Sequence, residues 1–283
     1  MSSDFFNIQE SAPLLTLDPQ GIWVAKANEV ISYPEDGNQT CFELEDKSYW
    51  FRHRNNLICE LYRKFDALDS IFDIGGGNGI VSKYLIDNGA SCVLVEPGRI
   101  GAINAKQRGV EHVIQATLKD AGFVTESIDH VGLFDVVEHI KDDLGFLQKI
   151  HEYQKNDKFL VLTVPSLNWL WSKEDVHAGH YRRYTKKALE ELLKNAGYEI
   201  CYCSYFFSFL TLPVFMVRTV PSVLGLRNRP SLKVAAREHT DTNPLVKKLL
   251  EKFMTYESNQ IRVLKKIGFG SSLIAIVRKH RTT

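Results

Sequence analysis

The sequence has almost no net charge, because 35 Lys and Arg residues face 34 Asp and Glu residues and leave a formal charge of +1. This balance excludes a global field that would draw the chain to nucleic acid, so we expect no nucleic-acid partner. The five cysteines form no C-x-x-C pair and are odd in number. They indicate reduced thiols in a cytoplasmic protein rather than a disulfide framework. Residues 1–4 lack the basic and apolar regions of a signal peptide, so we expect none.

Long apolar runs are also missing from the chain. The most apolar stretch, residues 209–217, is interrupted by Pro213 and is too short to cross a bilayer. There is no internal repeat and no low-complexity tract. What is present is an ordinary globular composition, with 44% hydrophobic and 24% charged residues in a chain of 283. That length fits one large domain, or one domain with an appendage.

A glycine-rich turn organises the rest of the sequence. The short apolar run that holds Asp73 leads into Gly75, Gly77 and Gly79, and then into an amphipathic stretch. The pattern predicts a strand, a tight loop and a helix. Glycine lets the backbone turn sharply and approach a ligand closely, because no Cβ intervenes. The N-terminus of the following helix offers N–H groups to an anionic group such as a carboxylate or phosphate.

The spacing of these glycines separates two classes of ligand. A dinucleotide-binding loop reads G-x-G-x-x-G/A, and its third small residue allows close helix packing, whereas Ile80 occupies that position here. The series from Asp73 reads D-x-G-x-G-x-G, which resembles the first motif of class I S-adenosylmethionine-dependent methyltransferases. The resemblance implies an α/β fold with a doubly wound, mostly parallel, seven-stranded Rossmann-like sheet. Its last strand, predicted at residues 272–277, would be antiparallel to the rest.

The same resemblance implies which residues hold the cofactor, S-adenosylmethionine. Asp73 would bind the amino group of this methyl donor by charge-assisted hydrogen bonds, and the glycines would let the backbone approach its amino-acid tail. Glu96 ends the next apolar run and would hold both ribose hydroxyls, although a chance acid at a strand end is its alternative. Thr117 and Leu118 would contact the adenine, without the acid that the family often has there. Phe134 belongs to the same predicted pocket.

A predicted helix from residue 49 precedes the first strand and begins with aromatic and basic residues. Trp50 and Arg54 in this helix allow two interpretations. They either begin a packed helix with a solvated rim, or they cap the cofactor pocket, where the ring shields the ligand and the arginine meets its carboxylate. Methyltransferases that this chain resembles have a similar aromatic-arginine helix. On that resemblance we assign Trp50 and Arg54 to the cofactor site.

Residues 133–140 give a second match to the family, a hydrophobic run that ends in an acid and is followed by Glu-His. In open α/β sheets, ligands bind outside the carboxyl ends of the strands. His139 is therefore expected near the methyl group that is transferred. It is either a catalytic base that deprotonates an acceptor or a structural histidine bonded to nearby backbone.

Residues 169–184 are unusually rich in Trp, His, Tyr and Arg for a connecting loop. They resemble a G-H-Y-R-R-Y stretch found in a bacterial branch of these methyltransferases. We expect this loop to line the acceptor pocket, with His180 as a second candidate base, although anchoring of the loop by its Tyr and Arg side chains is an equal alternative. His177 and His180 lack a supporting Cys or carboxylate pattern, so we predict no metal site. The candidate substrate-binding residues are Trp171, His177, Tyr181, Arg182 and Arg183.

We divide the chain into three parts. Residues 1–68 form an N-terminal cap segment, residues 69–207 and 268–283 form the cofactor-binding core, and residues 208–267 form an apolar and basic helical insertion. The insertion is either a lid or homodimer face, or a peripheral membrane contact through residues 209–237. Its basic residues include Arg218, Arg227, Arg229, Lys233 and Arg237.

The predicted function is that of an S-adenosylmethionine-dependent methyltransferase. Its acceptor would be a small molecule, a glycan or a lipid-linked intermediate, with O-methylation by a histidine base favoured. A catalytically silent module that binds S-adenosylmethionine is the first alternative. A nicotinamide-dependent oxidoreductase is the second, and Ile80 in the glycine loop argues against it.

Overall fold

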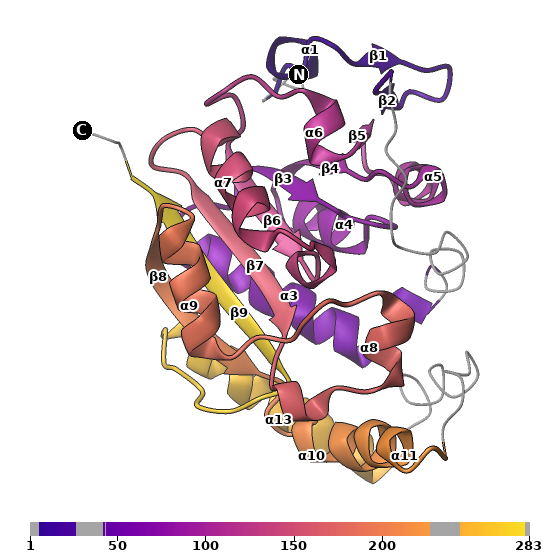
Figure 1. Cartoon of the computed structure of the whole chain (residues 1–283), viewed down its shortest axis with the longest axis vertical. Coiled ribbons are helices and arrows are strands. Elements are labelled where there is room, and N and C mark those ends of the chain that lie inside the picture. Colours follow the sequence, from indigo (N-terminus) through magenta and orange to yellow (C-terminus); the bar gives the residue numbers. More distant parts are fainter. Residues whose placement is uncertain (1–5, 27–41, 43, 227–243, 281–283) are drawn as a thin grey trace.

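The computed structural model describes residues 6–26, 42, 44–226 and 244–280. In these ranges nine strands form one mixed sheet in the order β1-β2-β5-β4-β3-β6-β7-β9-β8, with helices on both faces (Figure 1). The strands are β1 (Thr16–Leu17), β2 (Trp23–Val24), β3 (Ser70–Ile74), β4 (Ser91–Val95), β5 (His112–Gln115), β6 (His130–Phe134), β7 (Phe159–Pro165), β8 (Tyr198–Phe206) and β9 (Ser272–Lys279).

The strand directions confirm the predicted fold class. β3 pairs in parallel with β4 and β6, and the parallel ladder continues to β5 on one side and β7 on the other. β9 is antiparallel to both β7 and β8, as predicted for the last strand. The strand count exceeds the predicted seven, because β1 and β2 extend the sheet at the edge where β2 runs parallel to β5. The turn signals around residues 22–24 indicate a short strand-like piece there, which is β2, but its pairing with β5 joins distant parts of the chain and was not predicted.

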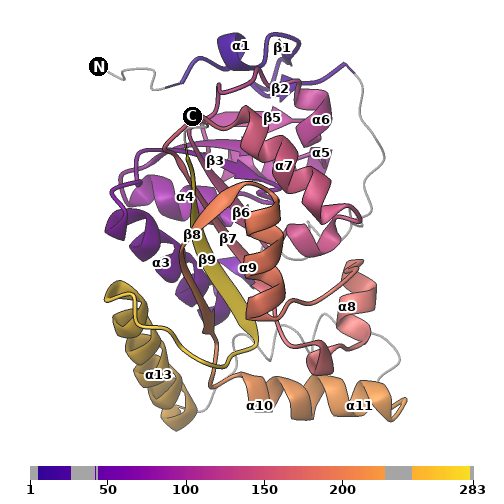
Figure 2. The ribbon, with the colours of Figure 1, turned by 60° about the vertical axis from the view of Figure 1, so that its left-hand side comes forward.

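Helices cover the two faces of the sheet (Figure 2). Apolar residues of α6, α7 and α9 pack on one face, and those of α3, α4 and α13 pack on the other, beside a smaller cluster under α5. Buried strand residues alternate between the two layers, since Phe72 faces the first and Ile71 faces the second. The α-helices are α1 (Ile8–Ser11), α3 (Tyr49–Lys64), α4 (Ile80–Asp87), α5 (Arg99–Gln107), α6 (Leu118–Ala121), α7 (Asp143–Tyr153), α8 (Lys173–Ala178), α9 (Lys186–Asn195), α10 (Thr211–Val214), α11 (Val220–Val223) and α13 (Pro244–Arg262).

Two short 3-10 helices and one π-helical turn complete the described structure. The 3-10 helices follow β6 and β7, and the π turn continues α10 directly into α11. They are η1 (Val137–His139), η2 (Asn168–Leu170) and η3 (Phe215–Thr219). η1 and η2 both begin just after a parallel strand ends, so they lie at the carboxyl edge of the sheet where ligands bind in folds of this class.

Helix α3 begins where the sequence predicted it. The Ser48 side chain caps it by accepting a hydrogen bond from the Trp50 backbone N–H at 3.2 Å. The predicted apolar face is buried against the sheet through Leu57, Ile58 and Leu61. A fully buried Leu or Ile side chain contributes about 1.5–3 kcal/mol to the free energy of unfolding. This packing fixes the N-terminal turn of α3, and with it Arg54, beside the end of β6.

A buried carboxylate joins α13 to this layer. Glu257 on α13 accepts hydrogen bonds from His53 Nε2 at 2.9 Å and from the Ser208 side chain at 2.5 Å. It also accepts the backbone N–H groups of Phe207 at 3.1 Å and Ser208 at 2.8 Å. One side chain thereby connects α13, α3 and the segment that follows β8. Part of the predicted stripe on α13 is exposed, at Val246, Leu249 and Phe253, and the stripe is fully buried only at Glu257 and Ile261.

The predicted insertion is helical in its described parts. α10, η3 and α11 lie at the lower end of the molecule in both ribbon views, beside α8 (Figures 1 and 2). Thr219 donates to the Leu170 carbonyl at 3.1 Å, and the Lys173 N–H donates to Ser222 at 2.9 Å, so the insertion contacts the loop after β7. Several of its apolar side chains are exposed: Leu212, Met216, Val217, Val223, Leu224 and Leu226.

The lid, homodimer and membrane interpretations of the insertion remain predictions. The basic residues Arg227, Arg229, Lys233 and Arg237 lie outside the described residues. Among the helices that the structure does describe, none combines the length and the apolar character needed to span a bilayer. The described cysteines, Cys59, Cys92, Cys201 and Cys203, are free thiols, and three of the four are buried.

Candidate functional site

The glycine loop joins β3 to α4 with a backbone that other residues rarely adopt. Gly75 and Gly77 have φ values of +73° and +53°, in the left-handed region that glycine enters without strain. A Cβ added at Gly77 would meet no atom within 4 Å, so this part of the loop borders open space. A Cβ added at Gly75 would lie 2.8 Å from the Val136 side chain. The loop therefore packs directly against the segment that joins β6 to η1.

Asp73 lies beneath this loop and is almost fully buried. Its Oδ2 accepts a hydrogen bond from Ser82 Oγ at 2.6 Å, while its Oδ1 is buried and has no hydrogen-bond partner in the described structure. Burial raises the pKa of Asp73 to about 6, against the opposing effects of Ser82 and Arg54. A buried acceptor without a donor is unfavourable by about 1–3 kcal/mol. An ammonium group at this position would supply the missing donor and the missing charge.

Glu96 lies on the other side of the loop, at the end of β4. Its Oε2 accepts the Gly77 N–H at 3.0 Å and its Oε1 accepts the Gly98 N–H at 2.7 Å. Burial raises the pKa of Glu96 to about 7. A carboxylate has about four acceptor positions, so two remain for the hydroxyl groups of a ribose. Both predicted acids therefore lie against the glycine turn, Asp73 beside Gly76 and Glu96 on the Gly77 N–H.

The residues predicted to hold the adenine are engaged within the protein. Thr117 Oγ1 donates to Asp120 Oδ2 at 2.8 Å and caps α6 by accepting the Asp120 N–H at 3.1 Å. Leu118 is buried in the core. The Phe134 ring lies over Gly132 and packs in the cluster beneath α3. Asp120 is an acid beside the predicted adenine site that the sequence analysis did not consider, because it lies beyond the expected position.

The predicted cap residues of α3, Trp50 and Arg54, contact each other and neighbouring aromatic and acidic side chains. The Arg54 guanidinium lies 4.7 Å from the centre of the Trp50 ring, and this ring stacks on Phe207 at 5.3 Å. Arg54 is buried and forms an ion pair with Asp135. Asp135 also accepts from Thr163 Oγ1 at 3.1 Å and has a φ of +58°, an unusual value for a residue other than glycine. Its pairing with Arg54 could not be read from the sequence.

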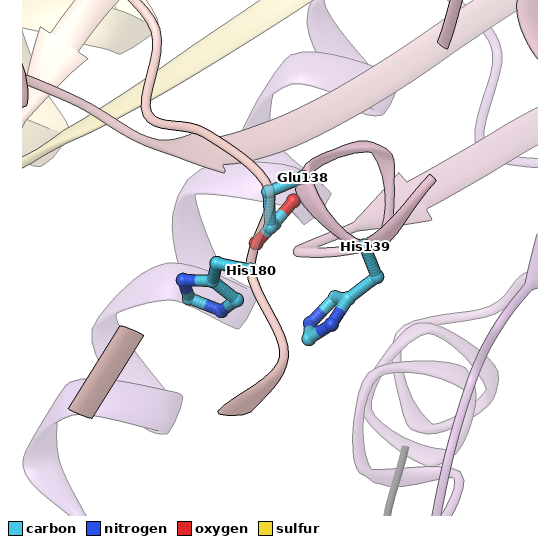
Figure 3. A group of neighbouring side chains, drawn as sticks. All are labelled: Glu138, His139 and His180. Atoms are coloured by element: carbon cyan, nitrogen blue, oxygen red, sulfur yellow. The ribbon is translucent and has the colours of Figure 1, made fainter. Parts of the chain in front are cut away.

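Three titratable side chains meet at the carboxyl edge of the sheet. Glu138 and His139 come from η1, and His180 comes from the loop after α8 (Figure 3). One ligand-type atom from each lies within 4.8 Å of the others. The two imidazole rings are 4.7 Å apart between centres and nearly perpendicular, at 80°. The structure therefore brings together both predicted histidines and adds Glu138, which the sequence indicated only as part of a Glu-His dipeptide.

The environment of this cluster sets its charge. Burial and then the neighbouring Asp135 carboxylate hold the pKa of Glu138 well above its ordinary value. Burial and then His180 lower the pKa of His139 to about 4, so its imidazole is neutral at pH 7. Such a cluster can accept a proton from a hydroxyl or coordinate a cation.

The Asp175 carboxylate fixes the orientation of the His180 ring. His180 Nδ1 lies 2.9 Å from Asp175 Oδ1, and the Arg183 guanidinium binds the same carboxylate in a bidentate manner, at 2.8 and 3.0 Å. Burial acts to raise the pKa of Asp175, but the hydrogen bonds from His180 and Arg183 outweigh it and the pKa is lowered. Asp175 is therefore an ionised carboxylate that fixes the His180 ring. This role was not predictable from the sequence, because Asp175 is also the third residue of α8 and forms an ordinary capping box with Ser172.

The remaining predicted acceptor residues have separate positions. Arg182 donates to the Lys141 carbonyl at 2.7 Å and pairs with Asp143 at 2.5 Å. Together with the Arg183–Asp175 pair, this favours the anchoring alternative for both arginines. His177 and Tyr181 are exposed, while the Tyr181 N–H donates to the Glu138 carbonyl at 2.8 Å. Trp171 is half-buried at the end of η2.

Asp73 makes the stability of the unliganded chain depend on pH. Its pKa is raised to about 6 in the fold, whereas an unfolded Asp titrates near about pH 4. Between these values the folded state binds more protons, so stability falls as the pH rises. We expect Asp73→Asn to gain stability relative to the wild type between pH 5 and pH 8, by about 1.4 kcal/mol. Urea unfolding at both pH values measures the difference. The variant Asp87→Asn, at an exposed position, should show the same stability difference from the wild type at both pH values. If the two variants change equally with pH, Asp73 does not titrate as a buried group.

Comparison with known proteins places this geometry in context. A family model described as a methyltransferase domain matches residues 50–202. Two Mycobacterium tuberculosis proteins, named as probable S-adenosylmethionine-dependent methyltransferases, are each 24% identical over 174 residues, which is 60% of this chain and 63% of theirs. The ubiquinone biosynthesis O-methyltransferase of Ruegeria pomeroyi is 32% identical over 93 residues, 30% of this chain and 36% of that protein. The match thus spans less than two thirds of the length of each of these relatives.

Solved structures share the fold at low sequence identity. Phosphoethanolamine N-methyltransferase 2 of Haemonchus contortus, with S-adenosylmethionine bound, has a TM-score of 0.54 and 14% identity over 88% of this chain and 58% of its own. The plantazolicin methyltransferase BamL, with S-adenosylhomocysteine bound, has a TM-score of 0.54 and 14% identity over 88% of this chain and 92% of its own. At this identity the similarity establishes the arrangement of strands and helices and nothing about the acceptor.

Proposed function

The chain belongs to the class I S-adenosylmethionine-dependent methyltransferases, with S-adenosylmethionine as its cofactor, and we propose that it methylates a hydroxyl group. The acceptor would be a small molecule, a glycan or a lipid-linked intermediate. The observation that carries the proposal is the cluster of Glu138, His139 and His180 at the carboxyl edge of the sheet. Family membership removes the nicotinamide-dependent oxidoreductase from consideration.

The chain's acids and glycines would hold the cofactor. Asp73 would receive the ammonium group, because one of its buried oxygens has no other partner in the described structure. Glu96 would bind the ribose hydroxyls through its remaining acceptor positions. Gly77, which has no Cβ, would let the backbone of the loop contact the cofactor closely. When bound, the sulfonium supplies an electrophilic methyl group, so the protein mainly has to position the two reactants.

The acceptor side of the site must remove a proton, since a neutral hydroxyl is a weak nucleophile. His180 is the better oriented of the two histidines, because its Nδ1 hydrogen-bonds to the Asp175 carboxylate while its ring contacts His139 in the cluster. The ionised Asp175 would also stabilise the imidazolium that forms. Val136 against Gly75 brings the cluster's own segment into contact with the glycine loop. The two halves of the reaction would therefore meet at this edge.

The test is the release of S-adenosylhomocysteine with a panel of phenols, sugars and polyprenyl-linked sugars. We expect turnover with a hydroxyl acceptor and a fall in kcat of about 100-fold or more in His180→Gln, because a positioned base contributes about 10²–10⁴-fold. Calorimetry should give unchanged affinity for S-adenosylmethionine in this variant. His112→Gln, at the start of β5 and away from the cluster, is the matched control. Cofactor binding without turnover on any member of the panel would favour the silent module instead.

A further inference from the structure

The Glu138 carboxyl group has no hydrogen-bond or ion-pair partner in the described structure. Its side chain is fully buried, and neither of its oxygens has a hydrogen-bond partner in the described structure. The neighbouring acids are balanced, since Asp135 pairs with Arg54 and Asp175 pairs with Arg183. Within the described residues, no Lys, Arg or His nitrogen lies within 4 Å of a Glu138 oxygen in an ion pair. Two buried carboxyl oxygens without a hydrogen-bond partner are unfavourable by about 1–3 kcal/mol each, so this position suits a ligand that can bind oxygen.

The two histidines are arranged as ligands in metal centres commonly are. A histidine that binds a metal through one ring nitrogen usually donates the other to a carboxylate or backbone carbonyl, which fixes its orientation. His180 uses Nδ1 on Asp175 at 2.9 Å. His139 is hydrogen-bonded to the backbone of Ala178, two residues before His180. Both rings are therefore held by outer contacts while they face Glu138 (Figure 3).

From this arrangement we propose that Glu138, His139 and His180 bind a divalent transition-metal cation. Around a tetrahedral ion with bonds of about 2.1 Å, ligand atoms lie about 3.4 Å apart. The three ligand atoms here lie within 4.8 Å of one another, so side-chain rotations would close the site without movement of the sheet. Two imidazoles and one carboxylate form a donor set that suits Zn²⁺ and related ions, and three protein ligands leave a position open. The structure thereby revises the sequence prediction of no metal site, which had paired His180 with His177.

The open position is where an acceptor oxygen would bind, and this part of the inference rests on the proposed function. A Zn²⁺ ion lowers the pKa of a bound water from about 16 to about 7–9, and a bound hydroxyl is acidified in the same way. The acceptor oxygen would lose its proton to solvent and form the new C–O bond as the S–C bond of the sulfonium breaks, which leaves a neutral thioether. The cation would then take over the task that the proposed function gives to the His180 imidazole.

Direct cation binding by the full chain tests the site. The protein is stripped with a chelator, desalted, and titrated with Zn²⁺ in a calorimeter and with Co²⁺ while its visible absorption is followed. We expect one cation per chain and a d–d absorption band from bound Co²⁺. Glu138→Gln and His180→Gln should each weaken binding at least tenfold and abolish the band. Glu152→Gln on α7 and His112→Gln on β5 are matched controls and should bind as the wild type does.

The affinity for S-adenosylmethionine, measured on every variant, shows whether the fold and the cofactor site are intact. If Glu138→Gln does not fold, His180→Gln and His139→Gln provide the same test. No stoichiometric cation on the wild type, or equal binding by the wild type and the cluster variants, would overturn the metal site. If methyl transfer persists in excess chelator, the reaction needs no cation, and the proposed function stands without the metal site. If the protein binds the cation but turns over no hydroxyl acceptor, the metal site stands and the proposed function fails.

Discussion

Asp73→Asn should reduce the affinity for S-adenosylmethionine by about 100-fold or more. The substitution keeps the shape of the side chain and removes its charge, and a charge-assisted hydrogen bond contributes about 1.5–3 kcal/mol, more where it is buried. Asp73 is buried, and its Oδ2 already accepts a hydrogen bond from Ser82. The other oxygen, Oδ1, would therefore bind the ammonium group away from solvent, where the bond is strong. Calorimetry with S-adenosylmethionine measures the change.

The control for this experiment is on the same βα unit. Asp87→Asn, at the exposed end of α4, removes the same charge while leaving the glycine loop untouched. It should bind S-adenosylmethionine as the wild type does. If Asp73→Asn and Asp87→Asn have the same dissociation constant, Asp73 does not hold the amino group of the donor. The thermal unfolding of unliganded Asp73→Asn shows independently that the variant is folded.

Glu257→Ala should lower the free energy of unfolding by about 3 kcal/mol or more. Truncation leaves His53 and the backbone N–H groups of Phe207 and Ser208 without their acceptor in a buried place. Each buried polar group left unpaired is unfavourable by about 1–3 kcal/mol, and removal of one partner from a buried pair by about 3–5 kcal/mol. Urea unfolding measures the loss, and an unchanged denaturant slope would show that the fold itself is retained.

An exposed glutamate on the same helix supplies the comparison. Glu251→Ala on α13 removes the same group from a solvated position and should change stability by less than about 0.5 kcal/mol. Equal stability of Glu257→Ala and Glu251→Ala would mean that the His53–Glu257 contact does not hold α13 to α3.

The central fold could be predicted because its signals are local. The Asp73 strand, the glycine turn and the next apolar run each carry a pattern that the structure reproduces as β3, the loop and β4. Failures occurred where long-range packing decides. The pairing of β2 is one such case, because it depends on the edge that β5 offers. Leu249 follows a helical period on α13 yet faces solvent, since period alone does not say whether another element covers a face.

In the candidate site, too, local features could be predicted and long-range pairings could not. Glu138 and His139 are adjacent in the chain, so their shared location was predictable, and the family resemblance placed His180 nearby. The partner of each charge was not predictable. Arg54 pairs with Asp135 and Arg183 pairs with Asp175, and these choices depend on which loops meet at the sheet edge. The sequence therefore suggested arginines for a ligand, whereas the structure shows their charges balanced by the protein.

Asp175 serves two tasks with one carboxylate. It fixes the His180 ring and receives both guanidinium bonds of Arg183, whose remaining nitrogen donates to the Ser166 carbonyl at 3.1 Å. The orientation of the His180 ring and the attachment of its loop to the end of β7 thus depend on a single side chain. Loss of the Asp175 carboxylate would therefore release the ring and the loop together, so the two cannot be altered separately at this position.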